Sequence, residues 1–221
     1  MPHDTQVAIV GGGPVGLALA ISLGQRGVRC ILVEPRTTMH RIPKGQNLTQ
    51  RTLEHFWCWG IVENLRRARM MPPDAPIGEI TAYGDLASEY WHAPRGRELV
   101  RPYYFQANDR MPQYCMEQVQ RDKVKTLPTV DARFGWRATG VTQDTDGVRV
   151  TIVNEATQQT ETITADYAVG CDGGNSLVRE TCGIARRGTD FDKLMVLVVF
   201  RSRDLNEKLK RFPPRSTFRV L

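Results

Sequence analysis

The chain has 221 residues, of which 41% are hydrophobic and 24% charged, and its formal net charge is +6. This composition is typical of a globular protein with room for one large domain or a domain and a half, and it excludes a low-complexity chain. The longest apolar run of the first half, residues 15–23, is far shorter than the roughly 20 residues that span a bilayer, and no basic leader precedes it. We therefore expect a soluble protein of the cytoplasm with no membrane partner.

Charge and cysteine content also narrow the possible partners. The basic clusters lack a nucleic-acid-binding signature and regular aromatic interleaving, so we expect solvated faces that attract small anions and no nucleic acid partner. These clusters are Arg66, Arg67 and Arg69; Arg95, Arg97 and Arg101; and Arg201, Arg203, Lys208, Lys210 and Arg211. The five cysteines form no C-x-x-C pair and have no histidines at metal spacing, which predicts reduced thiols and no metal site: Cys30, Cys58, Cys115, Cys171 and Cys182.

The first elements predict a strand, a helix and a second strand. Residues 6–10 are a β-branched run that ends in glycines, and Pro14–Gln25 carries apolar residues at helical spacing before Gly27. Residues 29–33 are a second apolar strand. Together they form one βαβ unit, whose helix connects two parallel strands.

The later elements are predicted in the same way. A polar loop, 35–47, precedes a helix over 49–69, which we expect to break near Gly60 and to end at Pro72 and Pro73. Next we predict two strands within 77–91, a helix after Pro112 that runs to 127, and a meander over 133–155 and 159–173 with a turn at 144–147. The last predicted elements are a short helix within 174–183 and strands over 193–202 and 216–221 with a charged helix between them.

The glycine turn carries the first functional signal. In the pattern G-x-G-x-x-G, Gly11 allows a tight turn, Gly13 lets the backbone approach a pyrophosphate, and Gly16 lets helix and strand pack closely. Glu34 ends the second strand, where its carboxylate can accept hydrogen bonds from ribose hydroxyls. NAD and FAD both fit these features, whereas the charge of Glu34 would repel the 2′-phosphate of NADP.

A second motif, "AVGCDGGNSLVR" at 168–179, follows a strand with an acid, two glycines and a helix start. Together with "GGGPVGL", "VEPR" and "PKGQNLTQRTLE", it makes residues 5–200 similar to the flavoprotein aromatic hydroxylases, such as para-hydroxybenzoate and phenol hydroxylases. The resemblance implies an α/β fold: a Rossmann-like FAD-binding domain, with a parallel sheet and a β-meander, and the beginning of a β-sheet substrate domain. We expect the FAD-binding domain at 1–76 and 103–182, and the partial substrate domain at 77–102 and 183–221.

The same resemblance implies the cofactor contacts. The glycines would line the FAD pyrophosphate, Glu34 would hold the adenosine ribose, Arg36 would lie over the adenine side, and Gln113 would contact the ribityl or phosphate region. Asp172 would lie near the pyrophosphate; its alternative role is to cap a turn. The expected cofactor-binding set is Gly11, Gly13, Pro14, Val15, Gly16, Glu34, Pro35, Arg36, Lys44, Gln113 and Asp172.

The implied reaction is reduction of FAD by NADH or NADPH, followed by transfer of one oxygen atom from O2 to a small aromatic, phenolic substrate. The resemblance names no catalytic acid or base in this chain, and His40, His55 and His92 are read as surface or structural residues. Pocket-lining candidates are Tyr83, Tyr90, Trp91 and Tyr103, and we expect a homodimer for the full-length protein.

Three departures from the family pattern affect this prediction. Lys44 stands where the family has an arginine, which keeps the charge but loses a bidentate phosphate contact, and Asn47 replaces a glycine. A late G-D motif of the family is absent. The segment "YGDLAS" contains Gly84 and Asp85, but these residues lie too early in the chain to be that motif and are read as a turn. We therefore expect the N-terminal portion of a longer hydroxylase, with weak flavin binding and little hydroxylation on its own.

The sequence is also compatible with other classes of enzyme. An NAD-dependent dehydrogenase or reductase could use the same βαβ turn, although no His, Lys or Tyr constellation for it is present. "WCWGI" at 57–61 resembles part of a flavin-dependent halogenase signature but lacks its proline, so we read its tryptophans as packing residues. An epoxidase of the same flavoprotein superfamily is a further alternative.

Overall fold

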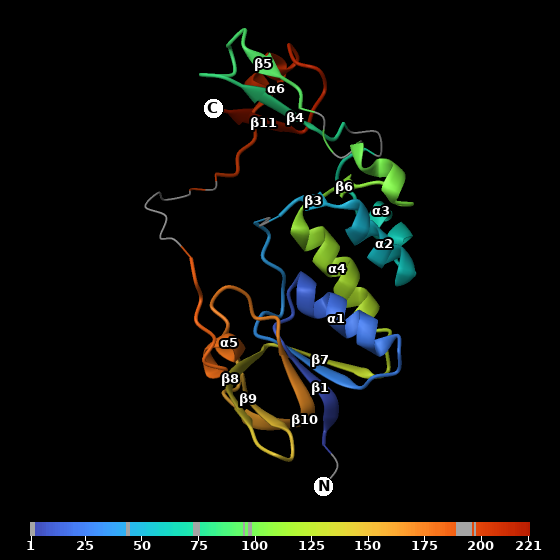
Figure 1. The fold of residues 1–221 in the computed structure, drawn as a ribbon, viewed down its shortest axis with the longest axis vertical. Helices are drawn as coiled ribbons and strands as arrows, with labels where there is room; N and C mark the ends of the chain where they lie inside the picture. The colour runs from blue at the N-terminus through green and yellow to red at the C-terminus, as the bar shows by residue number, and fades with distance from the viewer. Residues whose placement is uncertain are drawn as a thin grey trace. The chain divides into compact units, whose positions relative to one another are not determined.

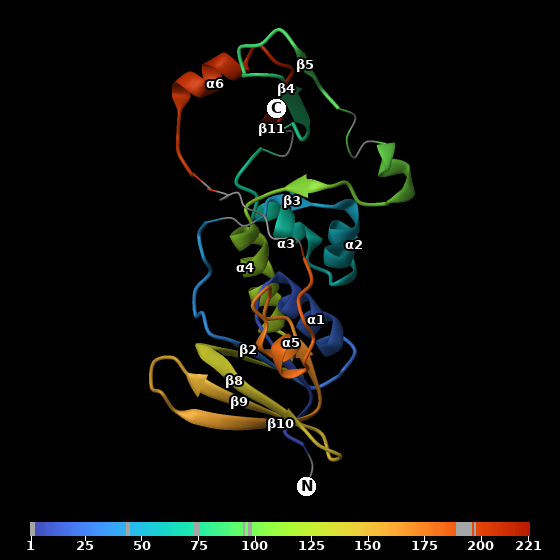
Figure 2. The ribbon, with the colours of Figure 1, turned by 60° about the vertical axis from the view of Figure 1, so that its left-hand side comes forward.

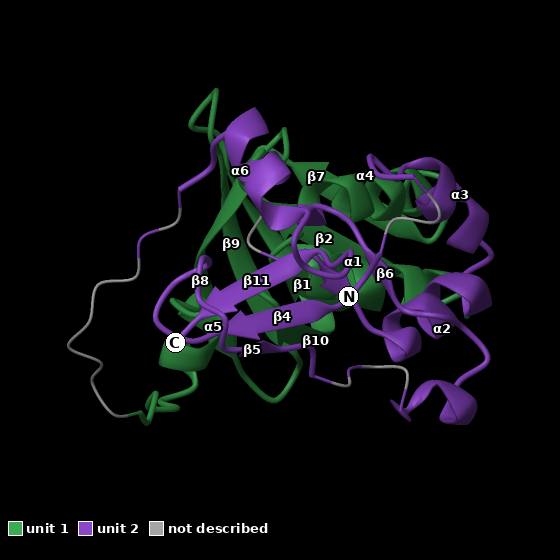
Figure 3. Ribbon diagram, turned by 90° about the horizontal axis from the view of Figure 1, so that it is seen from above, with its two compact units in different colours: residues 1–41, 114–190 green, residues 42–113, 191–221 purple. Residues whose placement is uncertain are grey.

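The computed structural model describes residues 3–42, 45–72, 76–94, 96, 99–188, 196 and 198–221. The chain divides into two compact units, coloured separately in Figure 3, and each is described by itself. Unit 1 comprises residues 1–41 and 114–190, and unit 2 comprises residues 42–113 and 191–221. This division follows compactness alone, so the cofactor and substrate domain boundaries inferred from the sequence stay predictions.

Unit 1 is built on a six-stranded sheet in the order β7-β2-β1-β10-β9-β8 (Figure 1). Its strands are β1 (Thr5–Val10), β2 (Cys30–Glu34), β7 (Val130–Phe134), β8 (Trp136–Gln143), β9 (Val148–Asn154) and β10 (Thr160–Gly170). The first four strands of that order are parallel, and β9 and β8 continue the sheet as an antiparallel meander from β10 (Figure 2). The predicted α/β fold with a parallel sheet and a meander is confirmed.

Strand β7 is the element of the unit 1 sheet that the sequence pattern did not predict as a separate strand. It pairs with β2 in parallel register, Cys30 opposite Val130 and Glu34 opposite Phe134. Its charged residues Asp131 and Arg133 interrupt the apolar pattern, and only Gly135, with φ +85°, separates it from β8. Residues 133 and 134, which the prediction placed at the start of the meander, therefore belong to β7, and the meander of the structure begins with β8.

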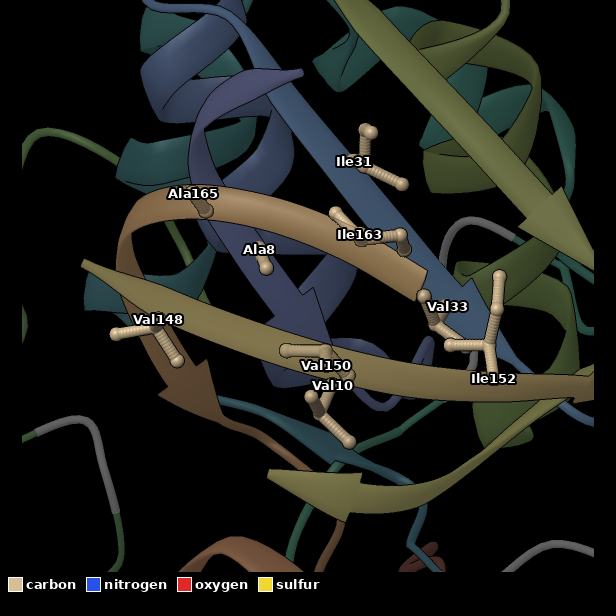
Figure 4. Close-up of a cluster of buried hydrophobic side chains, with 9 residues drawn as sticks. All are labelled: Ala8, Val10, Ile31, Val33, Val148, Val150, Ile152, Ile163 and Ala165. Atoms are coloured by element: carbon tan, nitrogen blue, oxygen red, sulfur yellow. The ribbon is translucent and has the colours of Figure 1, made fainter. Parts of the chain in front are cut away.

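Two layers cover the parallel strands. Helix α1 (Pro14–Gly24) packs on one face through Leu17, Ala20 and Ile21. Helix α4 (Gln113–Val124) lies beside α1, where the Gln120 amide donates to the Pro14 carbonyl. Because side chains alternate along a strand, the opposite face carries a separate apolar cluster. Figure 4 shows this cluster, which joins the parallel strands to the meander: Ala8, Val10, Ile31, Val33, Val148, Val150, Ile152, Ile163 and Ala165.

Unit 2 combines short helices with a small sheet. Helices α2 (Gln50–Cys58) and α3 (Val62–Arg67) form the predicted broken helix, and Gly60, with φ +73°, lies between them. A three-stranded sheet has the order β11-β4-β5, from Thr217–Val220, Glu79–Ala82 and Trp91–His92. The other described elements of unit 2 are the β3–β6 pair (Asn47–Leu48 with Asp109–Arg110), the 3-10 turn η2 (Arg101–Tyr103) and helix α6 (Arg203–Leu209). The short helix α5 (Leu177–Thr181) belongs to unit 1.

The predicted strand over 193–202 is not formed by its described residues. Residues 196 and 198–202 lie outside helices and strands, and the rest of that prediction lies outside the described residues. Val196, Val198, Val199 and Phe200 are all exposed, so their apolar pattern is not buried by the part of the chain described. Among the helices of the described segments, none combines the length and apolar character needed to cross a membrane.

Candidate functional site

The two sequence motifs meet at one edge of the unit 1 sheet. Strands β1 and β10 are parallel neighbours with Val10 opposite Gly170, and the Cys171 N–H donates to the Val10 carbonyl at 2.7 Å. Gly11 follows directly, with φ +104°, and a Cβ there would lie 2.4 Å from the Cys171 oxygen. Both the conformation and the space require glycine. Ligands of open α/β sheets bind at such a carboxyl edge, where the chain connections diverge.

The other two glycines of the motif have opposite surroundings. A Cβ on Gly16 would lie 1.9 Å from the Gly11 oxygen, so the start of α1 packs against the turn with no room for a side chain. A Cβ on Gly13 would meet no atom within 4 Å. Gly16 is thus a packing glycine, whereas Gly13 borders open space at the helix start.

The N-terminus of α1 is electrostatically suited to an anion. Gly13 is its N-cap and Pro14 its first helical residue, so the Val15 and Gly16 amides have no acceptor within the helix. Within α1, which is described in full, the first turn holds no acidic residue and no side chain caps the helix. These N–H groups can therefore donate hydrogen bonds to a phosphate, and the helix dipole favours its negative charge.

Glu34 is held by a set of hydrogen bonds at the end of β2. Its side chain is buried; Oε2 accepts from the Gly12 N–H at 2.8 Å, and Oε1 accepts from the Arg36 backbone N–H at 3.1 Å and from Arg36 Nε at 2.9 Å. A Cβ on Gly12 would lie 2.6 Å from the Glu34 Cβ, so position 12 requires glycine, as positions 11 and 16 do. Gly12 was not among the predicted site residues, although the run "GGG" contains it. Pro35 is half-buried, and the Arg36 side chain is about half exposed.

Asp172 caps the turn that leads into α5. Its Oδ1 accepts from the Ser176 hydroxyl at 2.5 Å and its Oδ2 from the Val178 N–H at 3.3 Å. Ser176 in turn accepts from the Arg179 N–H as the N-cap of α5. The carboxylate thus makes the contacts of its predicted alternative role as a turn cap, while its Cα borders Gly11. Burial, and then the charge of Asp172, raise the pKa of the adjacent Cys171 thiol.

Two of the predicted cofactor contacts lie outside the described part of unit 1. Gln113 begins α4 and belongs to unit 2, where its N–H donates to the Gly45 carbonyl at 3.0 Å. Lys44 lies outside the described residues. In the segments that the structure describes, no group of three or more His, Cys, Asp and Glu side chains is placed to hold a metal ion.

Aromatic side chains of unit 2 include the residues considered for other roles. In the "WCWGI" segment Trp59 is buried, and Trp57 is exposed and packs edge-on against Phe105, with ring centroids 5.1 Å apart. Trp91 packs against Phe212, and Tyr83 stacks on His92. These contacts are structural, and none of them identifies a catalytic group.

Comparison with known proteins gives a family. The profile of the family described as "FAD binding domain" matches residues 4–219. The FAD-dependent monooxygenase apdD of Emericella nidulans is 32% identical over 216 residues, which cover 93% of this chain and 34% of that protein. A 3-(3-hydroxy-phenyl)propionate/3-hydroxycinnamic acid hydroxylase of Mycobacterium sp. (strain JLS) is 32% identical over 204 residues, 84% of this chain and 31% of that protein.

A solved structure has a similar fold. The flavin-dependent monooxygenase PieE, in complex with FAD and substrate, matches with a TM-score of 0.75 and 27% identity, over 85% of this chain and 34% of that chain. The chain spans about a third of the length of these relatives. The family profile, the two relatives and this structure confirm the resemblance to flavoprotein hydroxylases that the motifs predicted. The chain belongs to the FAD binding domain family, whose relatives here are FAD-dependent monooxygenases and hydroxylases.

Proposed function

We propose that this chain binds FAD at the carboxyl edge of the parallel sheet. The observation that carries the proposal is the junction of β1, β10 and α1, where Gly13 borders open space and the helix start has amides for an anion. The diphosphate would lie at Gly11–Gly16, and Glu34 would accept from the adenosine ribose. A carboxylate has about four lone-pair positions, so Glu34 can keep its three hydrogen bonds and accept another.

The proposed activity is monooxygenation of a small phenolic substrate, with NADH or NADPH as reductant and O2 as oxidant. The names of the hydroxyphenylpropionate hydroxylase relatives support the aromatic substrate. Bound FAD would supply the redox chemistry, and the protein would bind and orient it. Pro35, Arg36, Lys44, Gln113 and Asp172 remain proposed cofactor neighbours, and the homodimer and the cytoplasmic location remain predictions.

The test is a titration of the purified chain with FAD, followed by quenching of flavin fluorescence and by retained yellow colour after gel filtration. We expect saturable FAD binding that exceeds NADH binding. Glu34→Gln replaces an acceptor oxygen with a donor group and should weaken FAD binding; Glu161→Gln, which alters a partner of Arg133 on the same sheet, is the matched control. A colourless chain that binds NADH tightly would instead support a dehydrogenase.

A further inference from the structure

The loop after β2 is held by a buried arginine from a distant helix. Arg121 of α4 is 5% exposed. Its Nη1 donates to the Thr37 carbonyl at 2.8 Å, and its Nη2 to the Arg36 carbonyl at 3.3 Å. One planar guanidinium thus fixes two successive peptide groups directly after the Glu34 segment.

The guanidinium is itself fixed by the neighbouring strand. Its central carbon lies 4.2 Å from the ring centroid of Phe134, in cation–π geometry. Phe134 ends β7 in register with Glu34 of β2. Arg121 therefore connects α4, β7 and the loop after β2.

The contacts of Arg121 are a poor source of stability. Both acceptors are neutral carbonyls, and among the described residues its buried Nε has no hydrogen-bond partner. Burial lowers the pKa of the guanidinium, and attraction to Glu34 and Glu117 acts in the opposite direction. A buried cation with incomplete hydrogen bonding carries a desolvation cost that an apolar side chain would not have. What the arginine adds is a fixed geometry.

We propose that Arg121 is a positioning residue for the adenosine half of the dinucleotide. By fixing the Arg36 and Thr37 carbonyls, it keeps the Arg36 backbone N–H and Nε on Glu34 Oε1. Glu34 is then held in one orientation by Gly12 on one oxygen and by Arg36 on the other. This inference rests on the proposed function, in which the same carboxylate accepts from the ribose.

The experiment compares Arg121→Met with Arg133→Met in the 221-residue chain. Methionine keeps an unbranched stem but removes the two hydrogen bonds. The side chain of Arg133, on β7, binds Asp131 and Glu161, and none of its described contacts involves the loop after β2. Calorimetric titrations measure the affinity for FAD and for ADP, and thermal melts measure folding. We expect Arg121→Met to weaken both ligands by about the same factor, roughly tenfold, and Arg133→Met to change neither by more than about twofold.

A double variant separates positioning from general damage. If Arg121 acts through the carboxylate, Glu34→Gln with Arg121→Met should bind FAD about as weakly as Glu34→Gln alone. Additive losses would overturn the inference, as would wild-type affinity in Arg121→Met, and both outcomes leave the proposed function intact.

Two further outcomes are also decisive. If Arg121→Met does not fold, Arg121→Lys, which keeps the charge but not the two-pronged contact, is measured in its place: weaker ADP binding supports the inference and unchanged binding overturns it. If the wild-type chain binds neither FAD nor ADP, the proposed function fails and the inference fails with it.

Discussion

Two alanine substitutions three residues apart should separate folding from cofactor binding. At Gly13, φ is −74° and ψ is −174°, which any residue can adopt, and an added Cβ meets no atom within 4 Å. At Gly16, the added Cβ would lie 1.9 Å from the Gly11 oxygen, a distance that only a backbone shift can relieve. The same methyl group is therefore harmless to the fold at one site and disruptive at the other.

The magnitudes follow from these surroundings. Gly13→Ala gains about 0.4–1 kcal/mol from the unfolded chain and loses a similar amount because alanine is a poorer N-cap than glycine, so the free energy of unfolding should stay nearly unchanged. Overpacking costs about 1–3 kcal/mol when side chains can yield, and more where a backbone atom is struck, so Gly16→Ala should lose about 3 kcal/mol or more. For a chain of this length, that corresponds to a fall in Tm of roughly 6–12 °C.

The assay pairs thermal melts with FAD titrations of both variants. We expect Gly13→Ala to melt with the wild type and yet to lose FAD affinity by roughly tenfold or more, because its Cβ occupies the space where the diphosphate would contact the backbone. Gly16→Ala should melt early. Normal FAD binding by Gly13→Ala would contradict a diphosphate at this turn, and a loss of stability as large as that of Gly16→Ala would contradict the open space at Gly13.

Further predictions concern the cap of α5 and the thiols. Ser176→Ala removes the N-cap and should lower the free energy of unfolding by about 1 kcal/mol in urea melts; an unchanged midpoint would contradict the cap. A disulfide reagent at about pH 8 should modify the exposed Cys58 and Cys182 quickly and leave Cys30 unmodified until the chain unfolds, because burial raises its pKa to about 11; mass spectrometry identifies the sites. Alkylation of Cys171 should begin at higher pH than for an ordinary thiol, since its raised pKa keeps it protonated, and FAD should slow it; equal rates with and without FAD would argue against a cofactor at Gly11.

Local patterns predicted much of the fold. The β1–α1–β2 unit follows from apolar periodicity and glycine punctuation, and both are properties of neighbouring residues. Strand β7 was not predicted, because Asp131 and Arg133 interrupt its apolar pattern, and the partner that Arg133 finds on β10, Glu161, is 28 residues further along the chain. The apolar run predicted as a strand shows the converse in its described residues, 196 and 198–202: β-branched side chains favour a strand, but these residues pair with no strand of the part described.

The sequence predicted the local part of the candidate site but not its long-range contacts. The spacing of the glycines and of Glu34 along the chain places them near one another once the βαβ unit forms. The contacts of Arg121 with the Arg36 and Thr37 carbonyls join segments 84 and 85 residues apart, and no local pattern signals them. Whether the Asp172 carboxylate caps a turn or meets a ligand likewise depended on where Ser176 and Val178 lie.

The pairing of β1 with β10 also governs when a cofactor could first be retained during synthesis. Val10 leaves the ribosome early, whereas Gly170, its partner in register, emerges only near the end of unit 1. Contacts between such distant segments form late, because chain closure must come first. A nascent chain that stops before β10 has its glycine turn and β2 but lacks β10 and the Cys171 backbone that lies against Gly11, so capture of the yellow cofactor would report completion of this unit during translation.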